Sequence, residues 1–144
     1  MTSSRSYLAR RLETIKFLTH DEIKRLLGVI TDKRDKAIFL LAYRHGLRAS
    51  EVGKLRVVDL DFKRLRLMVS RLKGSLPGEH PLQPDEARIL KSYLKSRGHD
   101  SPILFPSNRN LPISRQMLDR LMRYYGAQVK LPSDKRHFLV GQPR

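Results

Sequence analysis

One stretch of the sequence combines a charged side chain with the backbone turn that could hold it in place. Arg48 follows His45-Gly46-Leu47 and precedes Ser50-Glu51, which have the character of a helix start. Gly46 is expected just past the end of an apolar helix, because glycine adopts a positive φ without steric cost. A guanidinium at such a corner between two helices can bind a planar anion such as a phosphodiester. The alternative interpretation of Arg48 is an ordinary surface arginine at a helix corner.

The charge of the chain favours a polyanionic partner. The 144 residues include 30 Lys and Arg against 14 Asp and Glu, a formal net charge of +16. Such an excess attracts nucleic acid with a strong dependence on salt. A membrane partner is not expected, since the sequence has neither an apolar run long enough to span a bilayer nor a basic amphipathic helix with a large aromatic face. The chain has no cysteine, which excludes disulfides and cysteine-based zinc sites and permits a cytoplasmic location.

The length argues for one domain, and local signals predict its helices. Thr19 followed by Glu22 is typical of a capping box, and it opens a helix whose apolar positions run from Ile23 to Ile30. The other main helices are expected from Asp32 to His45, from Pro84 to Gly98 and from Ser114 to about Tyr125.

A change in the spacing of the apolar residues predicts a small antiparallel hairpin between the second and third of these helices. Leu65, Leu67 and Val69 alternate with polar or exposed positions, as in a strand with one apolar face. A turn cluster follows at 73–78, and residues 79–82 form the returning strand. This strand is expected at an edge, because Pro81 cannot donate to a ladder. The fold class is therefore α+β, mainly helical.

The segment 45–61 resembles the first catalytic box of the tyrosine recombinases, also called the phage integrase family. The family pattern is T/H-G-L-R-x-S-E-hydrophobic, followed by Leu and then D-hydrophobic-D. Residues 45–52, Leu55 and 59–61 match nearly every element of it. Lys73-Gly74 and Pro81-Leu82 also fit the family's K-G-x₆-P-L hairpin, although a Lys-Gly turn alone is more often simply solvated.

The resemblance implies a mechanism without a metal or nucleotide cofactor, in which a tyrosine attacks a phosphate of double-stranded DNA. Arg48 would be a phosphate clamp, Glu51 its supporting acid and Lys73 the general acid, with His137 a remnant of the second catalytic box. The residues expected to contact DNA are Arg48, Arg71, Lys73, Arg115, Arg120 and Arg123. For each of the last three, a solvated helix face is an equally good interpretation.

The resemblance stops near position 138. The family's second box reads H-x-x-R, but Val140 stands three residues after His137, and none of the five tyrosines follows it. We therefore expect a basic N-terminal arm at 1–16, a partial catalytic domain at 17–138 that lacks the last helices, and a divergent tail at 139–144, as after a truncation or frameshift. Such a chain would have no nucleophile and would bind no metal. By itself it would bind DNA but would not cleave it.

Two other interpretations stay open. The chain could be a non-catalytic modulator that associates with itself or with a full-length recombinase, or it could be a fragment of a type IB topoisomerase, whose chemistry uses the same residue types. The expected setting is the cytoplasm, with a prokaryotic or phage-encoded origin.

Overall fold

The computed structural model describes residues 18–69, 78–98 and 100–138. Its helices are α2 (His20–Val29), α3 (Lys33–His45), α4 (Ala49–Lys54), α5 (Pro84–Ser96) and α6 (Arg115–Gln128), with 3₁₀ turns η2 (Val57–Asp59) and η3 (Ser133–Lys135). Its strands are β1 (Leu60–Asp61), β2 (Arg66–Val69) and β3 (Gly78–Pro81). The arm at 1–16, Arg71, Lys73 and the tail at 139–144 lie outside the described residues.

The helix starts are confirmed by their caps. Thr19 Oγ1 accepts the N–H of Glu22 at 3.1 Å, and the Glu22 carboxylate accepts the N–H of Thr19 at 2.8 Å, which closes the capping box. Asp32 caps α3 through the N–H of Asp35, and Ser114 caps α6. These bonds satisfy N–H groups that have no partner within the helix, so the sequence itself fixes where each helix begins.

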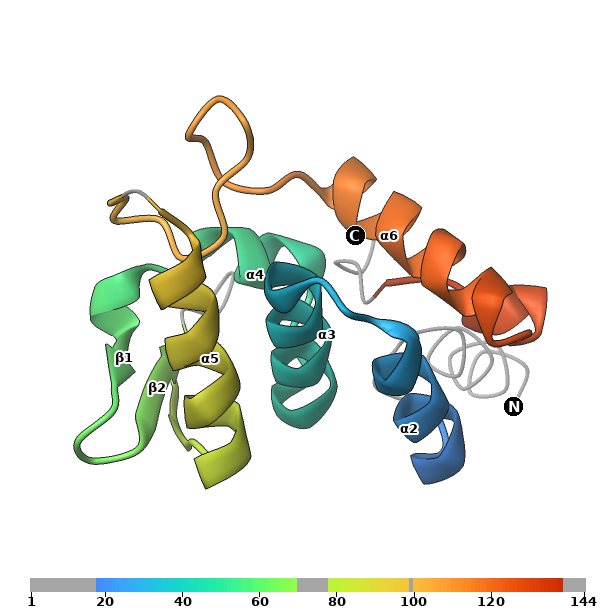
Figure 1. Cartoon of the computed structure of the whole chain (residues 1–144), viewed down its shortest axis with the longest axis horizontal. Helices are drawn as coiled ribbons and strands as arrows, with labels where there is room; N and C mark the ends of the chain where they lie inside the picture. The colour runs from blue at the N-terminus through green and yellow to red at the C-terminus, as the bar shows by residue number, and fades with distance from the viewer. Residues whose placement is uncertain (1–17, 70–77, 99, 139–144) are drawn as a thin grey trace, which may run out of the picture.

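Helix α3 lies at the centre of the molecule (Figure 1). It packs against α5, which runs beside the sheet, and against α2, which in turn contacts α6. The fully buried ring of Phe39 on α3 packs edge-on against Tyr125 of α6 and against Phe138, with centroids 5.8 and 5.4 Å apart. The core therefore joins α3 to both α6 and the segment after it. In the described part of the chain, no helix is long and apolar enough to cross a bilayer.

The sheet has the antiparallel order β1-β2-β3, so β3 is an edge strand as expected. Leu67 and Val69 are fully buried, whereas Arg66 and Met68 on the other face are exposed. The expectation that Leu65 belongs to this strand was wrong. Because β1 ends at Asp61 and β2 begins at Arg66, the chain must reverse between them, and Leu65 has a φ of 57° in that turn.

A buried pair of polar groups joins α3 to α6. The Tyr125 hydroxyl donates to Oδ2 of Asp35 at 2.5 Å, and both residues are buried. The Arg34 guanidinium donates to the other carboxylate oxygen at 2.9 Å, so the buried charge is compensated. Burial, followed by the bond to the Asp35 carboxylate, raises the pKa of Tyr125 well above its usual range.

Candidate functional site

The corner before Arg48 has the predicted geometry. Helix α3 ends at His45, and Gly46 follows in the left-handed region with φ 62° and ψ 40°. The backbone N–H groups of Gly46 and Leu47 both donate to the carbonyl of Ala42, which closes the end of α3. Leu47 is fully buried, and Arg48 then adopts an extended conformation as the N-cap of α4. The turn thus places Arg48 at the junction of the two helices.

Glu51 holds the backbone of Arg48 from the first turn of α4. Its Oε1 accepts the Arg48 N–H at 2.9 Å, and only 3% of Glu51 is exposed. A carboxylate in this position satisfies an N–H at the start of the helix. In the described part of the chain, the half-buried Arg48 side chain makes no ion pair or hydrogen bond of its own. The corner therefore fixes the backbone of Arg48 and leaves its guanidinium able to bind a ligand.

Of the other expected site residues, the structure describes the three arginines of α6 and His137. Arg115, Arg120 and Arg123 are exposed on α6, the helix against which α4 packs. His137 is also exposed, although Phe138 beside it is fully buried. No interaction among the described residues joins the His137 side chain to Arg48. Arg71 and Lys73 lie outside the described residues, so their expected convergence with Arg48 stays a prediction.

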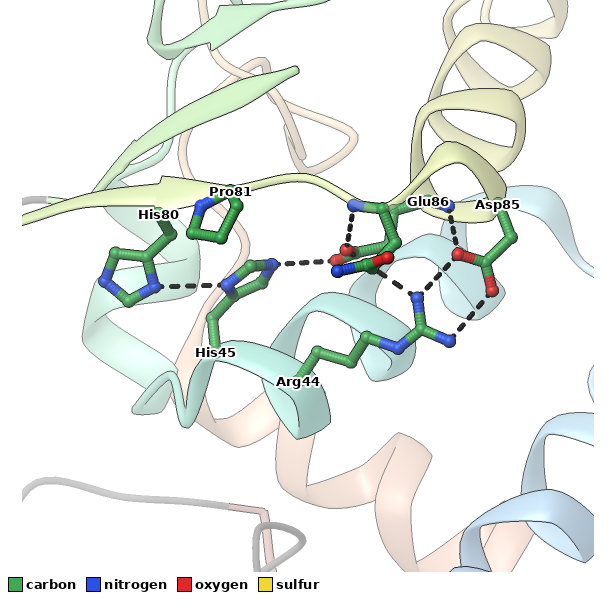
Figure 2. A pocket seen from close by; sticks show the side chains of 7 residues that line it. Arg44, His45, His80, Pro81, Asp85 and Glu86 are labelled. Carbon is green, nitrogen blue, oxygen red and sulfur yellow. Dashed lines mark hydrogen bonds and ion pairs between the residues drawn. The ribbon is translucent and has the colours of Figure 1, made fainter.

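A second polar cluster lies directly before the corner, and sequence analysis missed it. It lines a pocket of about 630 Å³ at the ends of α3, β3 and α5, formed by Arg44, His45, His80, Pro81, Gln83, Asp85 and Glu86. Figure 2 shows two side-by-side links from α3 to the start of α5. In one of them, Arg44 donates to the two carboxylate oxygens of Asp85 at 2.6 and 2.8 Å. This bond raises the pKa of Arg44 and lowers that of Asp85.

The other link is a chain of three side chains that share hydrogen bonds. Nε2 of His45 lies 2.7 Å from Oε2 of Glu86, and Nδ1 of His45 lies 3.1 Å from Nδ1 of His80 (Figure 2). Glu86 is 1% exposed, and its Oε1 accepts the N–H of Gln83 at 2.8 Å. His45, the last residue of α3, is therefore tied through both ring nitrogens to α5 and β3.

One sequence signal could have found part of this cluster. His80 pairs with Leu67 across the sheet. Side chains of directly paired residues project from the same face, so His80 had to point toward the apolar side. Among the described residues, no group of three or more His, Cys, Asp or Glu side chains could hold a metal ion.

Comparison with known proteins decides the family. The model of the phage integrase family matches residues 16–138. The chain belongs to this family. Tyrosine recombinase XerA of Pyrococcus horikoshii is 36% identical over 128 residues, which are 85% of this chain and 45% of that protein. Type 1 fimbriae regulatory protein FimB of Escherichia coli K12 is 34% identical over 123 residues, which are 80% of this chain and 62% of FimB. The chain thus spans about half the length of these relatives.

Solved structures give the same fold. The crystal structure of XerA recombinase matches with a TM-score of 0.71 and 28% identity, over 79% of this chain and 43% of XerA. XerH site-specific recombinase bound to its difH substrate has a TM-score of 0.67 at 15% identity, over 84% of this chain and 40% of XerH, a likeness of fold alone. The expected recombinase core, mainly helical with a small antiparallel sheet, is confirmed.

Proposed function

We propose that this chain is a recombinase-type domain that binds duplex DNA through the Arg48 corner, in site-specific recombination or integration. The observation that carries the proposal is the contact between the Glu51 carboxylate and the Arg48 backbone, which fixes the corner without occupying the guanidinium. The net charge of +16 supplies the long-range attraction. The complex of XerH with difH supports DNA as the partner, because XerH shares this fold.

The roles of the individual residues follow from this proposal. Arg48 would contact non-bridging phosphate oxygens, where a charge-assisted bidentate contact is strong. Glu51 would act through the backbone of Arg48, and Lys73 would protonate the departing 5′-oxygen. Flanking phosphates would be contacted by Arg71, Arg115, Arg120 and Arg123, of which the last three are exposed. His137 would be a weaker contributor near the second box.

We also propose that the chain does not cleave DNA alone. The hydroxyls of Tyr93 and Tyr125 donate to the Leu104 carbonyl and to Asp35, and burial raises the pKa of both tyrosines. A buried hydroxyl with a raised pKa is a poor nucleophile toward a phosphate. Cleavage would then need a hydroxyl that these two tyrosines do not supply, such as a tyrosine from a partner, either a second copy or a full-length recombinase. The proposed setting is the cytoplasm of a prokaryote, with the gene carried by the cell or by a phage.

Binding and cleavage are tested together on a fluorescent duplex and on the same duplex carrying a nick. Wild-type chain should bind the duplex, whereas Arg48→Ala should bind about tenfold more weakly, a loss of about 1.4 kcal/mol. Arg88→Ala removes an equal charge from an exposed position on α5 and should bind nearly as wild type. No covalent adduct should form on the nicked duplex. Equal affinity of the two variants would contradict the role of Arg48, and a phosphotyrosyl adduct would contradict the absence of cleavage.

A further inference from the structure

The exposed side of α5 carries a row of cations. Among residues 87–95, the fully exposed positions are Arg88, Lys91 and Lys95, and no acidic residue lies among them. Their spacing of three and four residues places the three side chains next to one another along the helix. The buried side chains of α5 lie on its other side, where the helix packs against α3. The row therefore faces away from α3.

The turn between β1 and β2 adds two further cations beside this row. Lys63 and Arg64 are exposed in the turn and follow Phe62 directly. Nζ of Lys91 lies 5.4 Å from the centre of the Phe62 ring, a cation–π contact that joins the turn to α5. Figure 1 shows α5 running beside β1 and β2. We call the resulting surface the α5 patch, which consists of Lys63, Arg64, Arg88, Lys91 and Lys95.

The α5 patch makes no ion pair with any carboxylate in the described part of the chain. The two acidic residues at the start of α5 both bind Arg44 instead. Asp61, the acidic residue nearest the turn, accepts the backbone N–H of Arg64 at 3.0 Å. Like charges at these helical spacings repel one another. The patch is therefore unfavourable to the chain alone and would be relieved by an anionic ligand.

The composition of the α5 patch favours a phosphate backbone over a protein as that ligand. Protein partners usually dock around large apolar or aromatic anchors that become buried. In the described part of the chain, the exposed large apolar residues all lie outside the patch, at Val58, Met68, Leu111 and Tyr124. Lysine and arginine without such anchors are typical of contacts to the backbone of nucleic acid. Five cations spread over a helix and a turn also fit a polymer better than one small anion.

We propose that the α5 patch binds the phosphate backbone of a second DNA duplex while the Arg48 corner binds the first, so that one chain bridges two duplexes. The two surfaces are separate, because α4, which begins after Arg48, packs against α6, whereas α5 packs against α3. The inference rests on the proposed DNA binding by Arg48. It adds a second DNA contact to that function, since recombination and integration both act on two stretches of DNA.

A bridging assay tests the second contact separately from the first. One duplex is fixed to beads and loaded with protein, and the capture of a second, fluorescent duplex is measured at low salt. The double variant Arg88→Glu with Lys95→Glu should capture about fivefold less than wild type, because it reverses the charge of the row. The matched control, Lys24→Glu with Lys33→Glu, makes the same change of charge at exposed positions on α2 and α3 and should capture nearly as wild type.

The first contact is measured with a single duplex in trace amount, which occupies the Arg48 corner. The reversal variant and its control should bind this duplex equally well, because the α5 patch contacts only the second duplex. Arg48→Ala should weaken binding of the trace duplex, as proposed above. A reversal variant that loses the trace duplex more than its control does would contradict the separation of the two surfaces.

The reversal variant should stay folded. Each introduced carboxylate lies three or four residues from Lys91, and opposite charges at these spacings stabilise a helix. Its midpoint in urea should therefore be no lower than that of wild type. If it unfolds more easily, Arg88→Ala with Lys95→Ala takes its place, because alanine favours the helix, and this variant should capture about threefold less of the second duplex than wild type.

The outcomes separate the inference from the proposed function. Equal capture by the reversal variant and wild type would overturn the inference, since bridging would then use another surface, such as an association of two chains. Tight binding of the trace duplex by wild type without capture of a second duplex would also overturn it. Tighter binding of a poly-glutamate peptide than of a second duplex, lost in the reversal variant, would assign the patch to an acidic protein instead of DNA. Failure of wild type to bind any duplex at low salt would contradict the proposed function itself.

Discussion

The backbone N–H of Arg48 donates to Oε1 of Glu51 at 2.9 Å, and this bond defines the first turn of α4. Removing it with Glu51→Ala should lower the free energy of unfolding by about 1–2 kcal/mol, as for a lost helix cap with a buried partner. Glu51→Gln keeps a carbonyl oxygen for the same N–H and should cost less. Urea denaturation measures both variants. Equal stability of Glu51→Ala and wild type would show that the bond does not hold the corner.

The turn at Gly46 needs a residue that tolerates a positive φ. Its φ is 62°, so Gly46→Ala should destabilise the fold by about 1 kcal/mol through strain on the added Cβ. Gly28→Ala is the matched control, because Gly28 lies within helix α2 with nothing within 4 Å of an added Cβ. That change should stabilise by about 0.5–1 kcal/mol. Thermal or urea unfolding should therefore move in opposite directions for the two variants, and a shared direction would contradict this account.

The bond from Tyr125 to Asp35 joins α3 to α6 across the core. Tyr125→Phe should cost about 2 kcal/mol, the usual value for a hydrogen bond to a charged group. Tyr124→Phe, at a side chain that is 61% exposed, should cost almost nothing. Because the folded pKa of Tyr125 is raised, its contribution is complete below about pH 10 and is lost as the pH rises further. Wild-type stability should thus fall more steeply above pH 10 than that of Tyr125→Phe.

The ion pair between Arg44 and Asp85 predicts the opposite pH dependence. The Arg44 guanidinium lowers the pKa of Asp85, so the pair stabilises the fold above the unfolded carboxyl pKa of about 3.9 and is lost as the pH falls below it. Both side chains are partly exposed, and Asp85→Asn should therefore cost only about 0.5–1 kcal/mol at pH 7. The difference from wild type should shrink as the pH falls below about 3.9 and through the lowered pKa of Asp85. Asp100→Asn, at an exposed position, should show no such pH dependence.

Local signals in the sequence predicted most of the fold. The caps at Thr19, Asp32 and Ser114 and the positive φ at Gly46 each depend on neighbours within a few residues, so they could be read directly. The family motif likewise lies in one continuous stretch around Arg48. The alternation of apolar and polar residues also identified β2. It failed at Leu65, because an apolar residue in the turn fits the same pattern.

The remaining contacts depend on tertiary packing that no local pattern reveals. His45 is 35 residues from His80 and 41 from Glu86, and Asp35 is 90 residues from Tyr125. Only the pairing of β2 with β3 and the packing of α3 on α5 bring the first set together. Apart from the face of the sheet on which His80 lies, the cluster beside the Arg48 corner could therefore not be predicted from the sequence.

The salt dependence of duplex binding tests the direct contact between Arg48 and phosphate most sharply. Each phosphate contact adds about 0.9 to the slope of log affinity against log salt concentration for duplex DNA. The account predicts that Arg48→Ala lowers this slope by about one, whereas Arg88→Ala leaves it nearly unchanged. The same slope for Arg48→Ala and wild type would contradict the claim that this guanidinium binds the DNA backbone.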